Sequence, residues 1–234
     1  MSANSTRPPA QPGGKQTGVF SFMDMVAKEA EEYATQHTSL LSPLVEEVER
    51  FTLANTPYPS MLSGRVEGRF LQFMVQLAGA RAIVEIGTFT GYSALAMAEV
   101  LPADGTVLTI EHNPEHARMA QNFFNQSPSK DKIILRRGDA LEILKTLPDG
   151  HADLVFIDAD KRDYCAYYGE AMRIVRNGGL ILADNALWYG RIFHPRDEGS
   201  RAVAAFNEMV KNDQRAEKVF LTIRDGIYLI RKTE

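Results

Sequence analysis

The chain has 234 residues, of which 44% are hydrophobic and 24% charged, which suits one ordinary globular domain with a substantial core. Its formal net charge of −4 gives no basic footprint for generic nucleic-acid binding, and no apolar run is long enough to span a bilayer. A single cysteine, Cys165, excludes an intrachain disulfide framework and fits a reducing compartment. Because the N-terminus also lacks an apolar signal core, we expect a soluble cytoplasmic protein.

The N-terminal third is predicted to be a tail followed by helices. Residues 1–18 are rich in Ser, Pro, Gly and Gln, which is typical of a disordered tail, so one domain is expected over 19–234. Apolar residues at helical spacing predict helices at about 22–37, 43–54 and 64–77. Ser42 and Pro43 have the residue types that favour the N-cap and the first helical position of the second helix.

From residue 82 onward, strands are expected to alternate with helices. The predicted strands are 82–86, 107–111, 132–136, 154–158, 180–183, 218–223 and 227–231, and the helices between them are about 91–101, 114–126, 140–147, 161–176 and 200–212. Alternation of this kind indicates a parallel sheet with right-handed crossovers. Only residues 224–226 separate the last two strands, so these must form an antiparallel hairpin. The predicted fold class is α/β, a seven-stranded and mostly parallel sheet with extra N-terminal helices.

A glycine turn follows the first predicted strand. The strand carries Glu85 and is followed by Gly87, Gly91 and the start of a helix. Glycines let the backbone approach a ligand, and a helix N-terminus offers unpaired N–H groups. The spacing E-x-G-x-x-x-G differs from the G-x-G-x-x-G of dinucleotide binders, which favours S-adenosylmethionine over a pyrophosphate ligand. A strand-to-helix turn can also need glycine for purely structural reasons.

Acidic residues follow the next two strands, where an open α/β sheet binds its ligands. Glu111 lies twenty residues beyond Gly91, which suits hydrogen bonds from ribose hydroxyls. It could instead be an exposed acid preceding the helix near Pro114. Asp139 could cap the following helix, contact a ligand, or do both, and Ala140 leaves room for a flat adenine.

Oxygen-bearing side chains end the fourth and fifth strands. Asp158 follows the fourth strand, and Asp184 with Asn185 follows the fifth. Together they form a half-shell of hard donors that suits Mg²⁺ better than zinc, since no His or Cys completes the set. Lys161 lies three residues beyond Asp158, so its amine could hang over the same rim. Taken singly, the acids could be helix caps and the lysine a surface residue.

Other polar and aromatic residues fit packing or surface roles. His112 and His116 flank a helix start without a third ligand, which favours a solvated helix turn over a metal site. Trp188 and His194 could line a substrate mouth or simply pack. Three tyrosines are expected to pack a helix against the sheet: Tyr164, Tyr167 and Tyr168.

Several separated motifs, in order, resemble the cation-dependent O-methyltransferases, which are class I methyltransferases with a Rossmann-like fold. The motifs are E-I-G-T-F-T-G-Y-S over 85–93, F-I-D-A-D-K over 156–161 and D-N-A-L-W over 184–188. The group includes caffeoyl-CoA O-methyltransferases and, more distantly, catechol O-methyltransferase. The resemblance runs from about residue 58 to 232. It implies S-adenosylmethionine as methyl donor, an essential divalent cation (Mg²⁺, or another such as Ca²⁺ or Mn²⁺) and a homodimer.

The resemblance also implies roles for individual positions. The metal would be held by Asp158, Asp184 and Asn185. Lys161 matches the general base of the family, so Lys161 and Asp158 are the expected catalytic residues. The implied cofactor contacts are Ser63 (mainly through its backbone), Glu85, Gly87, Thr88 and Ser93 at the methionine end, Glu111 at the ribose, and Asp139 with Ala140 at the adenine. Asp163 departs from the family pattern, which has asparagine there, and the first 55 residues match only loosely.

These observations predict methyl transfer to a catechol-type vicinal dihydroxy small molecule, such as a caffeoyl or flavonoid-like phenolic. A metal with three protein ligands leaves positions for two neighbouring substrate oxygens. One alternative is a tRNA hydroxyuridine O-methyltransferase of the same family, against which the acidic balance counts. A non-catalytic cofactor-binding protein is a second alternative, although the ligand positions and Lys161 are intact. A nicotinamide dehydrogenase is disfavoured by the missing glycine motif and by the terminal hairpin.

Overall fold

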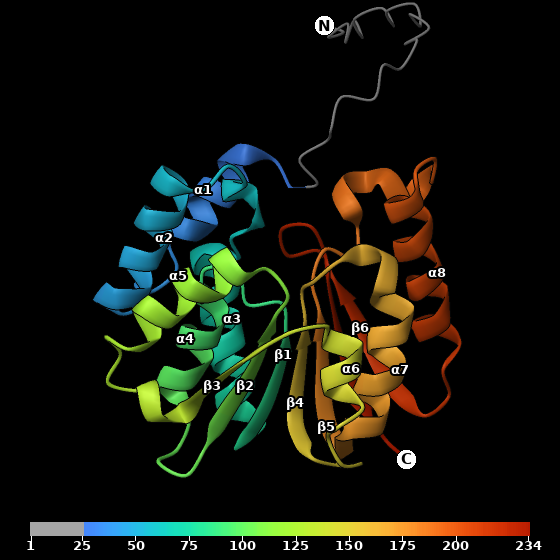
Figure 1. The fold of residues 1–234 in the computed structure, drawn as a ribbon. Coiled ribbons are helices and arrows are strands. Elements are labelled where there is room, and N and C mark those ends of the chain that lie inside the picture. The colour runs from blue at the N-terminus through green and yellow to red at the C-terminus, as the bar shows by residue number, and fades with distance from the viewer. Residues whose placement is uncertain (1–25) are drawn as a thin grey trace, which may run out of the picture.

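The structure, a computed structural model, describes residues 26–234, so the tail predicted at 1–18 lies outside the described residues (Figure 1). Its seven strands form one sheet in the order β3-β2-β1-β4-β5-β7-β6. The strands are β1 (Ala82–Ile86), β2 (Thr106–Glu111), β3 (Ile133–Arg137), β4 (Ala152–Ile157), β5 (Val175–Ala183), β6 (Ala216–Leu221) and β7 (Ile227–Lys232). Strands β1 to β5 pair in parallel, whereas β7 pairs antiparallel with β5 and β6. The predicted fold class is therefore confirmed.

The eight α-helices of the described chain follow the predicted order. They are α1 (Lys28–Gln36), α2 (Pro43–Asn55), α3 (Gly64–Leu77), α4 (Tyr92–Val100), α5 (Pro114–Phe124), α6 (Ala140–Leu144), α7 (Tyr164–Ile174) and α8 (Glu198–Asn212). The Ser42 hydroxyl accepts from the Val45 amide at 3.3 Å, so the predicted cap of α2 is confirmed. Lys161 lies not in α7 itself but in a preceding 3₁₀ turn, η3 (Lys161–Asp163).

Strand β5 begins five residues earlier than its pattern predicts, at Val175 instead of Leu180. The sequence between these positions includes Gly178 and Gly179, which read as a turn. In the structure this stretch is an irregular part of the strand, because the pairing with β4 shifts register between Ala152 and Leu154. A glycine-containing irregularity of this kind has no alternating pattern, so periodicity could not reveal it.

Helices cover both faces of the sheet (Figure 1), and a hydrophobic core lies on each face. Ile83 of β1 packs into the core that is shared with α2, α3, α4 and α5, while its neighbour Val84 packs into the core shared with α6, α7 and α8. Leu154 and Val155 of β4 divide in the same way. Because successive strand residues point to opposite faces, central strands buried on both sides carry continuous apolar runs.

The glycine turn after β1 is fixed by close backbone contacts. Gly87 has φ +100°, and a Cβ at this position would lie 2.0 Å from the carbonyl oxygen of Asp158. Gly91, with φ +92°, precedes α4, and a Cβ there would lie 2.6 Å from the ring of Phe124. Both positions exclude a side chain. The turn is therefore pressed against the end of β4, which brings the first glycine next to Asp158.

None of the helices in residues 26–234 is long and apolar enough to cross a membrane.

Candidate functional site

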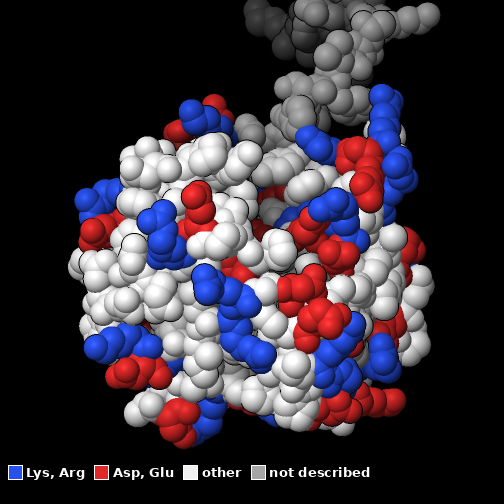
Figure 2. Space-filling view, viewed as in Figure 1, with Lys and Arg blue, Asp and Glu red and all other residues white. Residues whose placement is uncertain are grey.

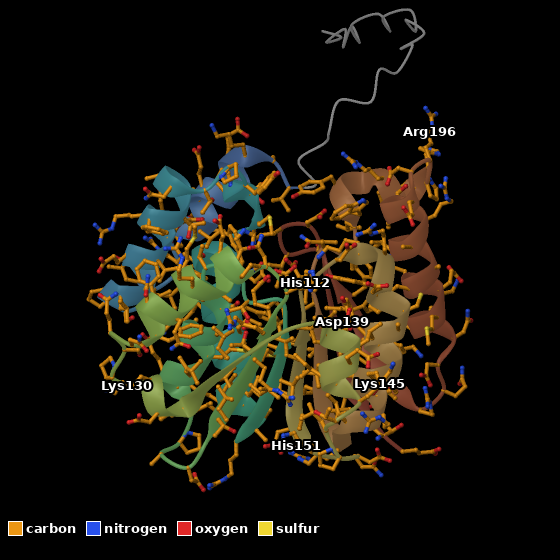
Figure 3. All side chains as sticks on the ribbon, in the orientation of Figure 1. His112, Lys130, Asp139, Lys145, His151 and Arg196 are labelled. Carbon is orange, nitrogen blue, oxygen red and sulfur yellow. The ribbon has the colours of Figure 1, made fainter. Side chains whose placement is uncertain are left out.

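A cleft of about 890 Å³ opens at the carboxyl ends of the parallel strands. Eight of the predicted site residues line it: Gly87, Glu111, Asp139, Ala140, Asp158, Lys161, Asp184 and Asn185. The other four, Ser63, Glu85, Thr88 and Ser93, are buried. Figure 3 shows His112 and Asp139 toward this edge of the sheet, with His151 near the opposite edge. The tertiary structure thus collects residues from five strand ends in one cavity, as an open α/β sheet predicts.

The pairing of β4 with β5 places two carboxylates side by side. Ile157 pairs with Ala183, so Asp158 and Asp184 directly follow paired positions on adjacent strands. The Asp184 amide donates to the Ile157 carbonyl at 3.0 Å, which extends the ladder past the ends of the strands. Neighbouring strands lie about 4.8 Å apart, so the two aspartates must share one small volume.

Asp184 is buried, and its Oδ1 atom has no hydrogen-bond partner in the described part of the chain. Burial, and next the negative charge of Asp158, raise the pKa of Asp184 to about 7. The charges of Arg224 and Lys161 oppose that rise. Two carboxylates, one of them with an unpaired buried oxygen, fit a bound divalent cation, because such a cation would replace their repulsion with attraction.

Asn185 joins these aspartates through its neighbour in the β6–β7 turn. Its side chain lies close enough to the carboxylate of Asp225 to lower the pKa of that group. The carbonyl oxygen of an asparagine side chain is an acceptor of the kind that a hard cation binds. Burial raises the pKa of Asp225 to about 6, and this carboxylate also accepts from the Tyr189 amide at 2.6 Å. Asp225 thus holds the loop that follows Asn185, a role that the sequence motifs did not reveal.

No group of three or more His, Cys, Asp or Glu side chains suited to a metal occurs within residues 26–234. The predicted set of two aspartates and one asparagine amide is of a different kind, and its metal-ligand role stays a prediction. His112 and His116 both line the cleft, and the ring of His116 packs edge-on against Phe89, with centroids 4.8 Å apart.

Lys161 is buried and holds two polar partners. Its Nζ donates to Asp158 Oδ1 at 3.0 Å and to the Tyr164 hydroxyl at 2.6 Å. The Tyr164 hydroxyl in turn donates to the Asp184 carbonyl oxygen at 3.0 Å. Burial holds the pKa of Tyr164 well above its usual range, so this phenol stays neutral. Tyr164 packs in the core as expected, but it also aims the lysine amine, a role that its position in an apolar helix does not indicate.

Glu85 is fully buried beneath the glycine turn. The Thr109 hydroxyl donates to Glu85 Oε2 at 2.5 Å, and the Thr88 and Thr109 hydroxyls are hydrogen-bonded to each other. Burial raises the pKa of Glu85 to about 8, although the hydroxyls of Ser93 and Thr109 oppose the rise. A carboxylate buried with this little compensation suits a site that receives a positively charged group.

Glu111 holds the glycine turn in place. Its Oε2 accepts from the amides of Thr88 at 3.2 Å and Phe89 at 2.8 Å, and its Oε1 accepts from the Asn113 amide at 2.8 Å. The carboxylate is therefore not simply an exposed acid, because three of its acceptor positions are used by backbone amides. Oε2 accepts two of these bonds, whereas Oε1 accepts only one and keeps a second lone pair that is compatible with the predicted ribose contact.

The remaining predicted residues have mixed outcomes. Asp139 caps α6, since its Oδ1 accepts from the Glu142 amide at 3.0 Å. Ser63 precedes α3, and its carbonyl accepts a hydrogen bond from Arg224. Trp188 lines the cleft, whereas His194 is not among its lining residues. Their contacts with a cofactor or an acceptor stay predictions.

An ion pair that the sequence motifs did not reveal joins the two walls of the cleft. Arg224, between β6 and β7, donates to Glu67 Oε2 at 2.6 Å, and Glu67 in α3 is fully buried. The same guanidinium donates to the carbonyl of Leu62 at 3.0 Å. These residues are about 160 positions apart in the chain, and neither belongs to a local motif. Only their meeting in the tertiary structure identifies them.

Backbone strain is concentrated around the cleft. Five non-glycine residues of the described chain have positive φ: Phe89, Asn185, Trp188, Tyr189 and Arg224. All five line the cleft. A positive φ costs a non-glycine residue roughly 1–2 kcal/mol, and such strain accumulates where function fixes the backbone. Charged side chains surround the hollow on the α7 and α8 side, whereas the α2 and α5 side is largely uncharged (Figure 2).

The burial of Glu85 predicts a stability that falls with rising pH. Its pKa is raised from 4.5 to about 8, so the folded state binds the proton more tightly than the unfolded state. The resulting stabilisation is complete below about pH 4.5 and is lost as pH rises through about 8. Glu85→Gln should therefore lose less unfolding free energy than the wild type between about pH 5 and pH 9. The difference should be on the order of a few kcal/mol, measured by urea unfolding.

The control for this prediction is Glu115→Gln, which changes an exposed carboxylate of α5 and should leave the wild-type pH dependence intact. Parallel curves for Glu85→Gln and the wild type would contradict the prediction.

Known proteins resemble this chain in sequence and in fold. The O-methyltransferase family profile matches residues 35–233. The caffeoyl-CoA O-methyltransferase 2 of Zea mays is 37% identical over 194 residues, covering 77% of this chain and 74% of the maize protein. The catechol O-methyltransferase of Niastella koreensis is 36% identical over 167 residues, covering 68% of this chain and 74% of its own length.

Solved structures give the same result. The O-methyltransferase TomG of Streptomyces achromogenes, solved in complex with SAM, is 27% identical, with a TM-score of 0.79 over 88% of this chain and 96% of that chain. The Bacillus cereus O-methyltransferase, solved in complex with SAH, is 28% identical, with a TM-score of 0.79 over 88% of this chain and 97% of that chain. The profile, the relatives and the fold agree, and the chain belongs to the O-methyltransferase family.

Proposed function

We propose that this protein is an S-adenosylmethionine- and divalent-metal-dependent O-methyltransferase that acts on a catechol-type vicinal dihydroxy small molecule, such as a caffeoyl or flavonoid-like phenolic. The observation that carries the proposal is the paired Asp158 and Asp184 at one end of the cleft, with a buried lysine amine 3.0 Å from the first. A glycine turn and a buried Glu85 lie at neighbouring strand ends. This combination serves the activation of a hydroxyl group beside a bound cationic donor.

S-adenosylmethionine would supply the methyl group, and residues at three strand ends would hold it. Its charged methionine end would be held by Glu85, Gly87, Thr88 and Ser93. Ser63 would contact it mainly through backbone atoms. Glu111 suits the ribose, and Asp139 with Ala140 suits the adenine. The proposed role of Glu111 in cofactor binding is supported by its hydrogen bonds to the Thr88 and Phe89 amides, because these bonds fix the glycine turn in one conformation. A fixed turn positions the reacting groups, which is a large part of the rate gain in bimolecular reactions.

Asp158, Asp184 and Asn185 would hold a divalent cation, with Mg²⁺ as the expected ion and Ca²⁺ or Mn²⁺ as alternatives. A bound cation would supply Lewis acidity that favours the ionised form of a phenol. The unpartnered Oδ1 of Asp184 and its place beside Asp158 at paired strand ends support this assignment. Lys161 would accept the hydroxyl proton of the acceptor, since Asp158 and Tyr164 aim its amine at the same rim.

A methylation assay tests the metal and the acceptor together. Transfer from labelled S-adenosylmethionine to catechol should disappear in EDTA and return with Mg²⁺, while a phenol with one hydroxyl and bulk tRNA should accept little label. Asp158→Asn should weaken Mg²⁺ binding, measured by calorimetry, by about 100-fold or more, because one of two anionic ligands is lost. Asp131→Asn, an exposed residue before β3, is the control. Full activity in EDTA would refute the metal dependence.

A second test concerns Lys161. Lys161→Met should lower kcat by about 100-fold or more, because a positioned base contributes this much to proton transfer. Binding of S-adenosylmethionine and Mg²⁺ by calorimetry should be retained. Lys145→Met, in an exposed ion pair with Glu142, should leave kcat unchanged. If kcat of Lys161→Met remained near the wild-type value, the lysine would have no role as base.

We further propose that the protein is a homodimer. Phe73 and Leu77 lie one turn apart on α3 and are 55% and 78% exposed, and Leu40 before α2 is 62% exposed. Apolar side chains exposed together on one helix face are typical of an interface. Light scattering should give twice the monomer mass for the wild type, and Leu77→Glu should shift the mass toward that of the monomer. A monomeric wild type would contradict the proposal.

A further inference from the structure

We propose that Arg224 recognises a carboxylate on the methyl acceptor, so that the preferred acceptor is an acidic catechol. This inference rests on the proposed function and specifies its substrate class. Arg224 lines the cleft, and its side chain is 29% exposed, so the guanidinium is reached from the cavity. Its φ of +48° is a conformation in which glycine would be free of strain. Arginine at this position therefore costs conformational free energy that glycine would not.

The guanidinium uses only part of its hydrogen-bonding capacity on the protein. Nη1 donates to Glu67 and to the Ser63 carbonyl, and Nη2 donates to the Leu62 carbonyl. An arginine has five N–H groups. Within residues 26–234, the N–H of Nε and one N–H of Nη2 have no hydrogen-bond partner. Nε and Nη2 share one edge of the planar group, and a fork of this kind matches a carboxylate.

The position of Arg224 favours the acceptor as the source of that carboxylate. The carbonyls of the next two residues, Asp225 and Gly226, accept from the amides of Leu187 and Ala186, just after Asn185, so Arg224 lies beside the proposed metal end of the cleft. Met61 and Tyr189 also line the cavity near Arg224. Met61 directly precedes Leu62, and the Tyr189 amide donates to Asp225, the residue after Arg224. An aromatic acceptor lying between these two side chains, with its hydroxyls toward Asp158 and Asp184, would present a ring substituent to the free edge of the guanidinium.

Two other roles would produce different results. Arg224 could serve only as a structural link between α3 and the β6–β7 turn, in which case its loss would affect all acceptors equally. It could instead bind the carboxylate of the methionine end of S-adenosylmethionine, in which case its loss would weaken cofactor binding. Comparison of an acidic acceptor with its neutral ester separates these roles from acceptor recognition.

The experiment compares caffeate with methyl caffeate in the wild type, Arg224→Gly and Arg224→Lys. Arg224→Gly removes the cation and also relieves the positive-φ strain, while Arg224→Lys keeps the charge but loses the fork. The wild type should prefer caffeate. In Arg224→Gly, KM for caffeate should rise by about tenfold or more relative to KM for the ester, since a charged hydrogen-bond partner of the acid is lost. Arg224→Lys should be intermediate.

The control is Arg231→Gln, which changes an exposed arginine of β7 paired with Glu217 at 3.4 Å and should match the wild type. Calorimetric titration of caffeate and its ester into the wild type and into Arg224→Lys compares the binding affinities directly. This comparison requires neither turnover nor the glycine variant. Three results would each overturn the inference. The first is an equal rise in KM for both acceptors, and the second is a wild type without preference for the acid. The third is weakened S-adenosylmethionine binding with an unchanged caffeate KM. Absence of methyl transfer to every catechol, with selective caffeate binding intact, would refute the proposed function alone.

Discussion

Two like charges held at adjacent strand ends are the constraint on which the rest of the cleft depends. The register of β4 and β5 fixes Asp158 and Asp184 next to each other, and Asp184 is buried. Their repulsion is expensive where water cannot screen it. The groups around them reduce that cost: Lys161 bonds to Asp158, and the charge of Arg224 acts on Asp184. A divalent cation would complete the same balance.

The β6–β7 turn contributes more to the cleft than its length suggests. Arg224 donates to the carbonyls of Leu62 and Ser63, which precede α3, and Asp225 accepts from the Tyr189 amide. Gly226 lies so close to Leu187 that a Cβ would approach its Cγ to 2.7 Å. A single turn therefore holds both the strained loop after β5 and the opposite wall of the cavity. Strain at these positions persists because the surrounding bonds over-determine the backbone.

Glu111 and Tyr164 show how one side chain can serve both architecture and chemistry. Glu111 fixes the glycine turn through two backbone amides, and the same carboxylate lies at the proposed ribose site. Tyr164 fills the core between α7 and α8, while its hydroxyl connects Lys161 to the Asp184 carbonyl. Changes at such residues would alter stability and activity together.

The sequence alone determined the order and type of the elements, because alternating and helical apolar spacings are local and the central strands are buried on both faces. It also identified the strand-end residues that line the cleft, since parallel strands deliver their carboxyl ends to one edge. The irregular start of β5, the Glu67–Arg224 pair, the bond of Asp225 to the Tyr189 amide and the Tyr164 contact with Lys161 were decided only by the tertiary structure. Each of these features depends on residues far apart in the chain or on the direction of a side chain. The local spacing of apolar residues contains no information about such contacts or directions.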